Sequence, residues 1–598
     1  MSHLFILRTS SIILSALLLA ATAACNDGNG GKTGDPCDPA AAVEGECEEG
    51  STCVEVAEGE GMCMEICDPA TGEPCDADET CFRYADDEYV CTPTCDPDDE
   101  DACAEGWICA RVAGDDTICR PGCDPGSPAC DEGEVCQPLD DGTSVCTTQC
   151  DPVNETGCSE GNVCELRTDG LYACYEPVRI KGMVFDSTDS DPIEGAHVIA
   201  ADKTGASATD VAATDGAGMY ELRVPVEREP DGTLSEGVLT LRVSAADYLP
   251  YPHGIRPAIP VDAAQAEEQA EGGWLLMNAT TDVALIPVPA DRQGQGSISG
   301  SIVTTGGNAT PAGVLVVVEG GSGDSPLGFA DRSGAYTVFN VPAGSWSVHG
   351  YKAFLQLDPA DVTLSDGENK TGVDLVENNK PFGTLLGDVN MVNAPGGAVT
   401  SVVIVPESTF SDLFVKGEVP PGLRAPPPPA DPSITGAFTI EGIPDGSYKV
   451  LAGFENDFLV RDPDPTIAGT DILDIEVPDG SSYELDYTSD NFKVTEALVI
   501  VSPGAEEPEP VTGTPIFIWE DDAGEDQYRI VVYNAFGDEM YRDDNLPRVT
   551  GGATVQVDYA GDPLEAGMYY QFRVMSYKDG TPRSQTEDLL GVFYVPGE

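Results

Sequence analysis

Twenty cysteines between Cys37 and Cys174, arranged in five consecutive groups of four, constrain this chain more than any other feature. In every group the second and third cysteines are six positions apart, and the third and fourth are ten apart. The next group begins four positions later, so only the first spacing varies. Such regularity marks an internal repeat, here of 27 to 30 residues.

A module of this size cannot bury enough apolar surface to fold unaided, so we expect disulfide bridges to hold it. Two bridges per module would each contribute about 2–4 kcal/mol in the chain-entropy model. Polar turn residues between short apolar runs predict a hairpin between the third and fourth cysteines. Four cysteines allow three pairings, and the spacing does not choose among them; we expect only that bridges stay inside modules. The expected disulfide cysteines are Cys37, Cys47, Cys53, Cys63, Cys67, Cys75, Cys81, Cys91, Cys95, Cys103, Cys109, Cys119, Cys123, Cys130, Cys136, Cys146, Cys150, Cys158, Cys164 and Cys174.

Metal binding is the competing interpretation of these cysteines. The Cys63/Cys67 spacing falls within the range of zinc ligands. An exported chain oxidises such thiols, however, and no histidine lies between Cys37 and Cys174. Acidic clusters such as residues 96–101 could collect calcium, although none has the pattern of an EF-hand loop. We therefore expect no metal site and no cofactor, with calcium as the weaker alternative.

The N-terminus indicates export. The apolar run Ile12–Ala20 is too short to span a bilayer permanently, and small residues follow it, which is typical of a signal peptide. The sequence before Cys25 resembles a bacterial lipobox, which implies lipidation of Cys25; Thr22 departs from that motif, so ordinary cleavage after Ala23 or Ala24 stays open. Cysteine parity favours lipidation, because removing Cys25 from the 21 cysteines leaves only complete groups of four.

The charge is strongly acidic. With 29 basic and 105 acidic residues, the formal net charge is −76, and residues 26–175 alone hold 38 acidic against five basic residues. Such a chain repels nucleic acid and anionic membrane surfaces, so neither is an expected partner. The plain interpretation is that the charge keeps an exposed chain soluble; cations and basic partners remain open.

After Cys174 the cysteines stop and the chain alternates between apolar strands and Gly, Asp or Pro turns, which predicts antiparallel β-sandwiches. One phrase, Gly-x-aromatic, an apolar strand and then Pro-x-Gly-Ser-aromatic, runs through residues 334–346 and returns at 436–448; residues 216–225 carry its first part. It resembles the carboxypeptidase-regulatory-like family, transthyretin-like sandwiches of the carbohydrate-binding-like fold that are related to B-type repeats of Gram-positive adhesins. The resemblance implies rigid spacers or binding modules without catalysis. Lys181 lacks convincing partners for the isopeptide bond of some relatives.

Two further segments stand out in the C-terminal half. The Pro-rich residues 418–432 are predicted to form an extended surface loop. The last hundred residues resemble a fibronectin type III domain: Trp519 would be its buried tryptophan, and Tyr570 its corner tyrosine, flanked by Leu564 and Val574. Ala566 stands where proline is usual, so a generic sandwich is the alternative.

No residues are predicted to be catalytic. The histidines His3, His197, His253 and His349 are scattered, and the Gly-x-Ser-x-Gly at residues 157–161 lacks the strand and helix that a nucleophile elbow needs. We expect an all-β, multidomain, non-enzymatic protein: small disulfide-rich repeats followed by Ig-like or transthyretin-like sandwiches. The predicted divisions are a signal peptide (1–24), a lipidated tether (25–36), five four-cysteine modules (37–177), three family-like sandwiches (178–290, 295–379 and 380–490) and a fibronectin-III-like sandwich (494–598).

This arrangement is reminiscent of myxobacterial surface lipoproteins. It implies a protein anchored by lipid in the outer membrane of the cell envelope and exposed at the surface. There it would be a structural or adhesive scaffold for a surface protein or polysaccharide. The second hypothesis is carbohydrate or peptidoglycan binding, which an exposed aromatic platform on a sandwich would favour; Trp346 and Tyr448 are expected to be core residues instead. The third hypothesis is that the protein is an enzyme.

Overall fold

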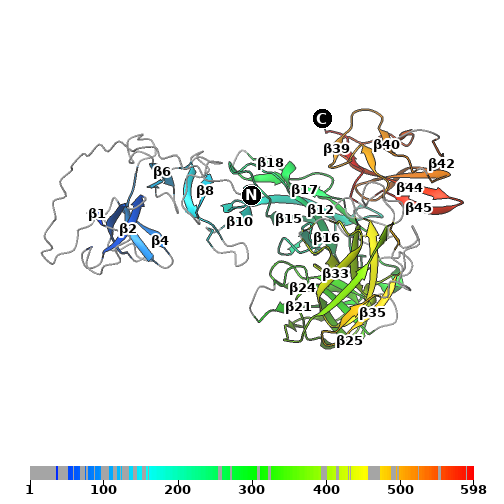
Figure 1. The fold of residues 1–598 in the computed structure, drawn as a ribbon, viewed down its shortest axis with the longest axis horizontal. Helices are drawn as coiled ribbons and strands as arrows, with labels where there is room; N and C mark the ends of the chain where they lie inside the picture. The colour runs from blue at the N-terminus through cyan, green and yellow to red at the C-terminus, as the bar shows by residue number, and fades with distance from the viewer. Residues whose placement is uncertain are drawn as a thin grey trace, which may run out of the picture. The chain divides into compact units, whose positions relative to one another are not determined.

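The computed structural model describes residues 36–37, 47, 51–57, 60–67, 75, 79–85, 88–95, 107–111, 117–121, 123, 134–138, 144–150, 157–158, 161–252, 259–269, 272–305, 310–320, 325–391, 400–411, 417–428, 430, 432–454, 472–485, 493–494, 497–522, 524–549, 554–586 and 589–597. Two compact units are present: Met1–Cys130 with Pro138–Cys146, and Asp131–Gln137 with Thr147–Glu598. Within the described residues the regular structure consists of β-strands and three short 3-10 helices, so the protein is all-β (Figure 1).

Each cysteine module is built on two short strands. The pairs β2–β3, β4–β5, β6–β7 and β10–β11 are antiparallel hairpins between the third and fourth cysteines, as predicted. In these hairpins the two cysteines lie directly opposite each other, for example Cys81 and Cys91. The strands are β1 (Pro36–Cys37), β2 (Ser51–Ala57), β3 (Glu60–Glu65), β4 (Glu79–Ala85), β5 (Glu88–Pro93), β6 (Trp107–Arg111), β7 (Thr117–Pro121), β8 (Glu134–Pro138), β9 (Ser144–Thr148), β10 (Val163–Leu166) and β11 (Tyr172–Tyr175).

Three sandwiches of one plan follow. The first has sheets β15-β12-β19-β18, with β20 also paired to β12, and β14-β13-β16-β17; the second has β24-β21-β27, with β28 on β21, and β23-β22-β25-β26; the third has β33-β29-β36 and β32-β31-β34-β35, with β30 on β37. The first sandwich comprises β12 (Val178–Asp186), β13 (His197–Ala201), β14 (Ala212–Ala213), β15 (Met219–Val224), β16 (Val238–Ser244), β17 (Val261–Asp262), η1 (Ala263–Gln265), β18 (Glu267–Glu268), β19 (Trp274–Leu276) and β20 (Val283–Leu285). The second comprises η2 (Ala290–Arg292), β21 (Gly296–Val303), β22 (Leu315–Glu319), β23 (Leu327–Phe329), β24 (Ala335–Val341), β25 (Gly344–Tyr351), β26 (Ala360–Leu364), β27 (Asn369–Lys370) and β28 (Leu375–Val376). The third comprises β29 (Gly383–Asp388), β30 (Asn390–Met391), β31 (Thr400–Pro406), η3 (Glu407–Thr409), β32 (Arg424–Ala425), β33 (Ala437–Ile443), β34 (Gly446–Phe454), β35 (Leu473–Val477), β36 (Ser482–Glu484) and β37 (Lys493–Val494).

The repeated Gly-x-aromatic phrase has a common structural cause. Its aromatic residue lies in register with a glycine of the first strand: Tyr336 opposite Gly300 in the second sandwich and Phe438 opposite Gly387 in the third. The Tyr336 hydroxyl donates a hydrogen bond to the carbonyl oxygen of Val373. A β-carbon at Gly300 would collide with that same carbonyl, so only glycine leaves the ring its path across the sheet.

The second half of the phrase closes the turn between two strands. In the second sandwich the Trp346 ring nitrogen donates to the Pro342 carbonyl at 2.9 Å. In the third, the Tyr448 hydroxyl donates to the Pro444 carbonyl at 2.9 Å. Each aromatic therefore satisfies the carbonyl of the proline four residues earlier. Tyr448 is fully buried and Trp346 is half-buried, so both pack within their own domains, as expected.

Two features differ from the sequence-based expectation. The last strands of each sandwich return parallel, not antiparallel, to its first strand, as β27 and β28 do on β21. The Pro-rich segment is not wholly a surface loop, because Leu423, Arg424 and Ala425 are buried and β32 pairs with the edge of β31. Apolar residues inside the Pro-rich run made this short strand possible, and the following proline, which cannot donate to a ladder, ends it.

The C-terminal sandwich packs sheet β38-β40-β43 against β39-β46-β44-β41-β42, with β45 on β44. Trp519 is fully buried, and the Tyr570 hydroxyl accepts a hydrogen bond from the Glu565 amide at 2.7 Å, the geometry of a tyrosine corner. The strands are β38 (Ile500–Ser502), β39 (Glu509–Pro510), β40 (Ile516–Glu520), β41 (Gln527–Asn534), β42 (Glu539–Pro547), β43 (Thr554–Asp558), β44 (Tyr569–Lys578), β45 (Thr581–Gln585) and β46 (Val592–Tyr594). Among the described residues, none belongs to a helix with the length and apolar character needed to cross a bilayer.

Candidate functional site

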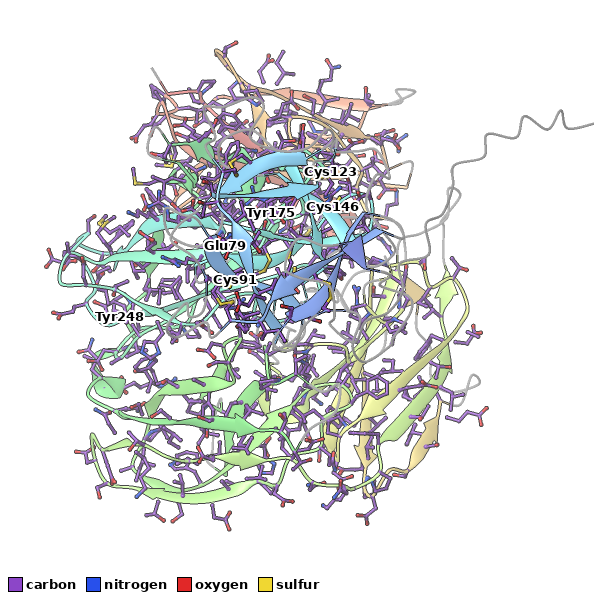
Figure 2. The ribbon with its side chains drawn as sticks, turned by 90° about the vertical axis from the view of Figure 1, so that its left-hand side faces the viewer. Glu79, Cys91, Cys123, Cys146, Tyr175 and Tyr248 are labelled. Carbon is purple, nitrogen blue, oxygen red and sulfur yellow. A yellow bond between two sulfur atoms is a disulfide. The ribbon has the colours of Figure 1, made fainter. Side chains whose placement is uncertain are left out.

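Six disulfide bridges define the pairing rule of the cysteine modules. The bridges are Cys47–Cys63, Cys67–Cys81, Cys75–Cys91, Cys95–Cys109, Cys150–Cys164 and Cys158–Cys174. All six lie inside one module and join its first cysteine to the third or its second to the fourth. The bridged residues are 14 or 16 positions apart. Each bridge therefore joins a cysteine that precedes the hairpin of a module to a cysteine within that hairpin, such as Cys91, which is labelled in Figure 2.

The remaining predicted cysteines are described less completely. Cys123, Cys136 and Cys146 are disulfide-bonded, and for Cys37, Cys53 and Cys119 only the backbone is described. Cys25, Cys103 and Cys130 lie outside the described residues, as does the acidic cluster at 96–101. Two groups of three sulfur atoms come close together, one at Cys67, Cys75 and Cys91 and the other at Cys150, Cys158 and Cys174. Because every sulfur in both groups belongs to a disulfide, none is a thiolate that could bind zinc.

The same backbone contact recurs inside successive modules. The amide of Cys67 donates to the Tyr89 carbonyl at 3.0 Å, and that of Cys95 donates to the Thr117 carbonyl at 2.9 Å. In both cases the first cysteine of a module bonds the residue two positions before its fourth cysteine. The linker between modules is therefore fixed to the next hairpin by a hydrogen bond that repeats along the chain.

A buried ion pair fastens the fifth module to the first sandwich. The Arg228 side chain donates from Nε to Glu165 Oε2 at 2.6 Å, and both side chains are almost fully buried. Arg228 also donates to the Glu176 carbonyl at 2.8 Å and lies over the Tyr175 ring. Burial raises the pKa of Glu165 to about 7 against the opposing effect of Arg228. The last module and the first sandwich are thus joined by a buried ion pair in which each side chain compensates the charge of the other.

The first and second sandwiches meet through backbone and polar contacts. The Asn340 side chain accepts from the Asp247 amide at 2.7 Å and donates to the carbonyls of Ala245 and Tyr248. Asn340 has a φ of 58°, a left-handed conformation that asparagine tolerates better than most residues. Ser207 adds a hydroxyl bond to the Ala330 carbonyl at 2.7 Å. One side chain therefore bonds three backbone groups of the neighbouring sandwich.

The second and third sandwiches share a hydrophobic core. Strand β22 is buried on both faces: Val316 and Val318 face its own core, whereas Leu315 and Val317 belong to the core of the third sandwich. Tyr351 joins that cluster and contacts the Tyr448 ring edge-on at 5.9 Å. The green and yellow strands of these two sandwiches lie side by side in Figure 1. Neither sandwich is complete without the other.

The C-terminal sandwich packs on the first sandwich, far from it in sequence. The rings of Phe185 and Phe536 meet edge-to-face at 5.2 Å. The Tyr569 hydroxyl bonds Gln265 at 3.3 Å, and Ile259 is buried in the same small apolar cluster. The order in which the domains pack is therefore not the order in which they follow along the chain.

A cavity of about 100 Å³ lies between the first two sandwiches, where β13 and β16 face β23 and β24. The guanidinium of Arg242 sits 3.5 Å from the centre of the Phe329 ring and bonds the Gly205 carbonyl. Asp331 accepts from Ser333, Ala335 and Val211. Its charged lining groups are thus engaged within the protein, and the cavity is best described as a gap in the junction.

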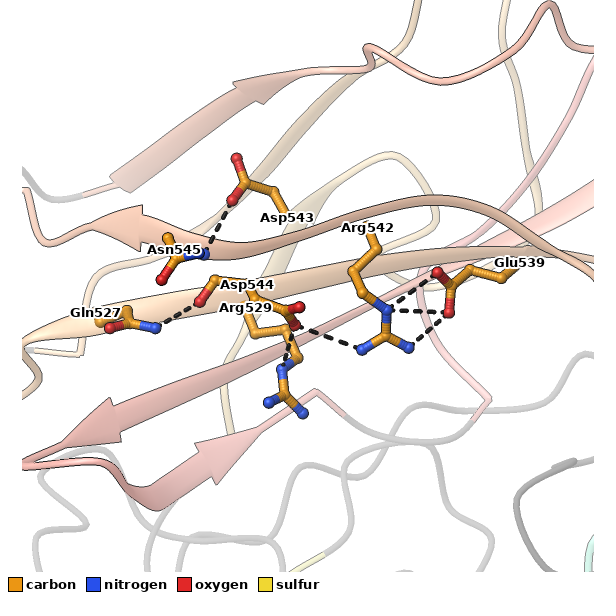
Figure 3. A network of polar contacts seen from close by, with 7 residues as sticks. All are labelled: Gln527, Arg529, Glu539, Arg542, Asp543, Asp544 and Asn545. Carbon is orange, nitrogen blue, oxygen red and sulfur yellow. Dashed lines mark hydrogen bonds and ion pairs between the residues drawn. The ribbon is translucent and has the colours of Figure 1, made fainter.

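Charged residues also form a network on the C-terminal sandwich (Figure 3). Arg542 donates to both carboxylate oxygens of Glu539 and approaches Asp544 at 3.4 Å, while Arg529 pairs with Asp544 at 2.8 Å. These groups are between one third and one half exposed. Pairs this exposed contribute little to stability, and they neutralise one another.

The side chains singled out as potential chemistry do not converge. His197 packs against Phe339 in the first junction, and His349 stacks on Tyr351 in the second sandwich. Lys181 forms an exposed ion pair with Glu221. Sequence reasoning missed the exposed ring pair Phe354 and Phe382 at the junction of the second and third sandwiches. Nothing in its local pattern distinguishes this pair from core aromatics.

Comparison with known proteins gives distant likenesses. No family model and no curated protein matches the chain. Among solved structures, the Bacillus anthracis TIE protein is 11% identical over 74% of this chain and 75% of its own, with a TM-score of 0.13. A streptococcal ancillary pilin is 12% identical over 54% and 99%, with a TM-score of 0.14, and the major pilin subunit of Bacillus cereus is 9% identical over 53% and 97%, with a TM-score of 0.13. These likenesses carry no argument about function, which is therefore argued from this chain's own residues.

Proposed function

We propose that this chain is a non-enzymatic scaffold, anchored by a lipid on Cys25 in the outer membrane and exposed at the surface of the cell envelope. The observation that carries the proposal is the shared core of the second and third sandwiches, in which Leu315 and Val317 of one domain pack inside the other. Domains that share buried apolar side chains cannot hinge freely, because hinging would expose those side chains to water.

The other junctions support the same mechanical role. The Arg228–Glu165 pair fixes the last cysteine module, Asn340 fixes the first junction, and the Phe185–Phe536 contact fixes the C-terminal sandwich. The modules gain their order from bridges that close loops of 14 or 16 residues, each expected to contribute about 3 kcal/mol. Junctions and modules fixed in this way suit a structural scaffold.

Rigidity is tested by uncoupling the shared core. Leu315→Asp places a carboxylate in the junction, where its burial is costly. Val303→Asp, at a position that is 40% exposed on the second sandwich, is the matched control. In the wild type we expect the second and third sandwiches to unfold in urea as one transition, and in Leu315→Asp as two. Two transitions already present in the wild type would contradict the proposal.

Anchoring is tested by mass spectrometry of the mature protein. Lipidation predicts an acylated N-terminal Cys25 and ten bridges without a free thiol. Cys25→Ser should release the protein from the membrane fraction into the soluble fraction. An unmodified Cys25 in the native protein would refute the anchor while leaving the shared core untouched.

The second candidate function is carbohydrate binding. The observation that favours it is the exposed ring pair of Phe354 and Phe382 on an otherwise acidic surface. Retention of the full-length protein on insoluble polysaccharide, measured by co-sedimentation, is the general test.

A further inference from the structure

Two phenylalanines form an exposed corner beside the junction of the second and third sandwiches. Phe354 is 55% exposed and Phe382 is 36% exposed. Their ring centres are 6.0 Å apart and their planes meet at 69°, so the rings present two walls of an open angle. We call this pair the aromatic corner. Apolar rings held in water at a domain junction call for an explanation, since burial would have stabilised the protein.

The backbone holds Phe354 in an unfavourable conformation. Its φ is 58°, in the left-handed region where a bulky residue is strained and glycine is not. The Phe354 amide donates to the Gly442 carbonyl at 2.9 Å, which fixes this conformation. The ring lies against Gly442, where a β-carbon would be 2.7 Å from ring atoms. The exposed ring is thus held in one conformation at a cost in backbone strain. Strain kept at an exposed side chain is typical of a binding surface that is fixed before its ligand arrives.

Polar side chains border the corner. Lys380 pairs with Asp445 at 3.1 Å, and the Asn378 side chain donates to Asp358 at 2.8 Å. Asn378 and Lys380 come from the segment that leads into Phe382, Asp445 from the turn that follows Gly442, and Asp358 from the segment that follows Phe354. Hydrogen-bond donors and acceptors are therefore close in sequence to both rings and to Gly442.

We propose that the aromatic corner binds a pyranose ring of a neutral, β-1,4-linked polysaccharide. The flat C–H face of such a sugar carries slight positive charge and stacks on the electron-rich face of an aromatic ring. Its equatorial hydroxyls point sideways, towards groups such as Lys380, Asp445 and Asn378. This inference deepens the carbohydrate-binding candidate by naming its site and its ligand class.

Size and charge exclude the other occupants. The exposed parts of the two phenylalanines offer on the order of 200 Å², whereas a stable protein complex buries about 800 Å² on each partner. A polysaccharide chain is narrow enough for such a surface. Lys380 is already paired with Asp445, and the whole chain carries −76, so an acidic polysaccharide would be repelled.

Co-sedimentation of the full-length protein with cellulose and with chitin tests the inference, together with retardation in native gels that contain hydroxyethylcellulose. Polygalacturonate is the anionic comparison. Phe354→Gly removes one wall and at the same time suits the left-handed backbone, so it should fold. Phe382→Ala removes the other wall. Tyr483→Ala is the matched control, because Tyr483 is 39% exposed on the third sandwich outside the corner.

The wild type and Tyr483→Ala should bind at least one neutral polysaccharide, polygalacturonate should not be bound, and each corner variant should bind about tenfold more weakly or worse. Neutral binding that both corner variants retain would overturn the inference while leaving carbohydrate binding in place. Failure of the wild type to bind any neutral probe would overturn both. Preferential binding of polygalacturonate would overturn the assigned ligand class.

Discussion

The ion pair between Arg228 and Glu165 gives the sharpest prediction about how the cysteine modules are fixed to the sandwiches. Arg228→Ala removes the Nε donor at 2.6 Å from Glu165, the donor to the Glu176 carbonyl and the cation over the Tyr175 ring. Glu165 would remain buried with only the Val226 amide at 3.1 Å as a described hydrogen-bond partner. Breaking one partner of a buried pair typically costs about 3–5 kcal/mol.

That cost has a local readout in hydrogen exchange. The amides of Val226, Arg228 and Thr168 all donate across this junction, to Glu165 Oε1, Leu166 O and Arg228 O. A loss of about 3–5 kcal/mol corresponds to exchange on the order of 10² to 10⁴ times faster at these amides. Exchange in the C-terminal sandwich should stay unchanged.

Two variants separate this interaction from a general effect. Lys181→Ala breaks an exposed pair in the same sandwich and should cost less than about 1 kcal/mol. Replacing both partners by apolar residues, Glu165→Leu with Arg228→Met, should restore most of the protection, since no buried charge is left alone. If the junction amides exchange no faster in Arg228→Ala than in Lys181→Ala, the junction does not depend on the buried pair.

Three more predictions each concern a single residue. Burial raises the pKa of Glu165 to about 7 from an unfolded value of 4.5, so the folded protein holds this proton more tightly than the unfolded chain. The free energy of unfolding should therefore fall by up to about 3 kcal/mol as the pH rises from 4.5 to 7. Urea titrations at a series of pH values measure this slope, and Glu165→Gln should flatten it. Gly300→Ala should destabilise the second sandwich by about 1–3 kcal/mol or more, because its β-carbon meets the Val373 carbonyl, whereas the exposed Ser301→Ala should be neutral in the same melts. Asn340→Ala removes three hydrogen bonds and a residue that tolerates the left-handed backbone, so it should lower the free energy of unfolding by about 2–4 kcal/mol. Calorimetry that finds no change would show that the first junction has no role in stability.

The sequence was most informative where a residue acts within its own repeat. Alternating apolar runs predicted the strands, and the repeated Gly-x-aromatic phrase predicted that the sandwiches share one plan; the pairing of Tyr336 with Gly300 was seen only in the structure. The spacing of polar residues likewise predicted the hairpins between third and fourth cysteines. These features depend on neighbours in sequence or on the two-residue period of a strand, which can be read without knowing the fold.

The disulfide pairing could not be read in the same way. Cys81 and Cys91 lie directly opposite each other, so a hairpin alone would suggest that they are bonded. Their bridges run instead to Cys67 and Cys75, which precede the hairpin in the sequence. The observed pairing therefore links the hairpin to the part of the module before it, and cysteine spacing alone does not report this.

The junctions were hidden because their partners are far apart in sequence. Glu165 and Arg228 are 63 residues apart, and Ser207 and Ala330 are 123 apart. Strand β22 shows the difficulty well: its unbroken run of buried residues fits a strand inside one sandwich, but half of them serve the next one. A continuous apolar run indicates that both faces of a strand are covered, but it does not indicate which domain covers each face.

The aromatic corner illustrates the opposite limit. Gly442 and Phe354 are each unremarkable in the sequence, and only the fold shows that one makes room for the other's ring. Glycine at position 354 would relieve the left-handed backbone and still donate the same amide to the Gly442 carbonyl. It would lose the ring's contacts with Gly442 and Phe382 together with the exposed wall. The strain at Phe354 therefore maintains a ring that is 55% exposed, and this is why the corner, and not the cavity between the first two sandwiches, is the place to look for a ligand.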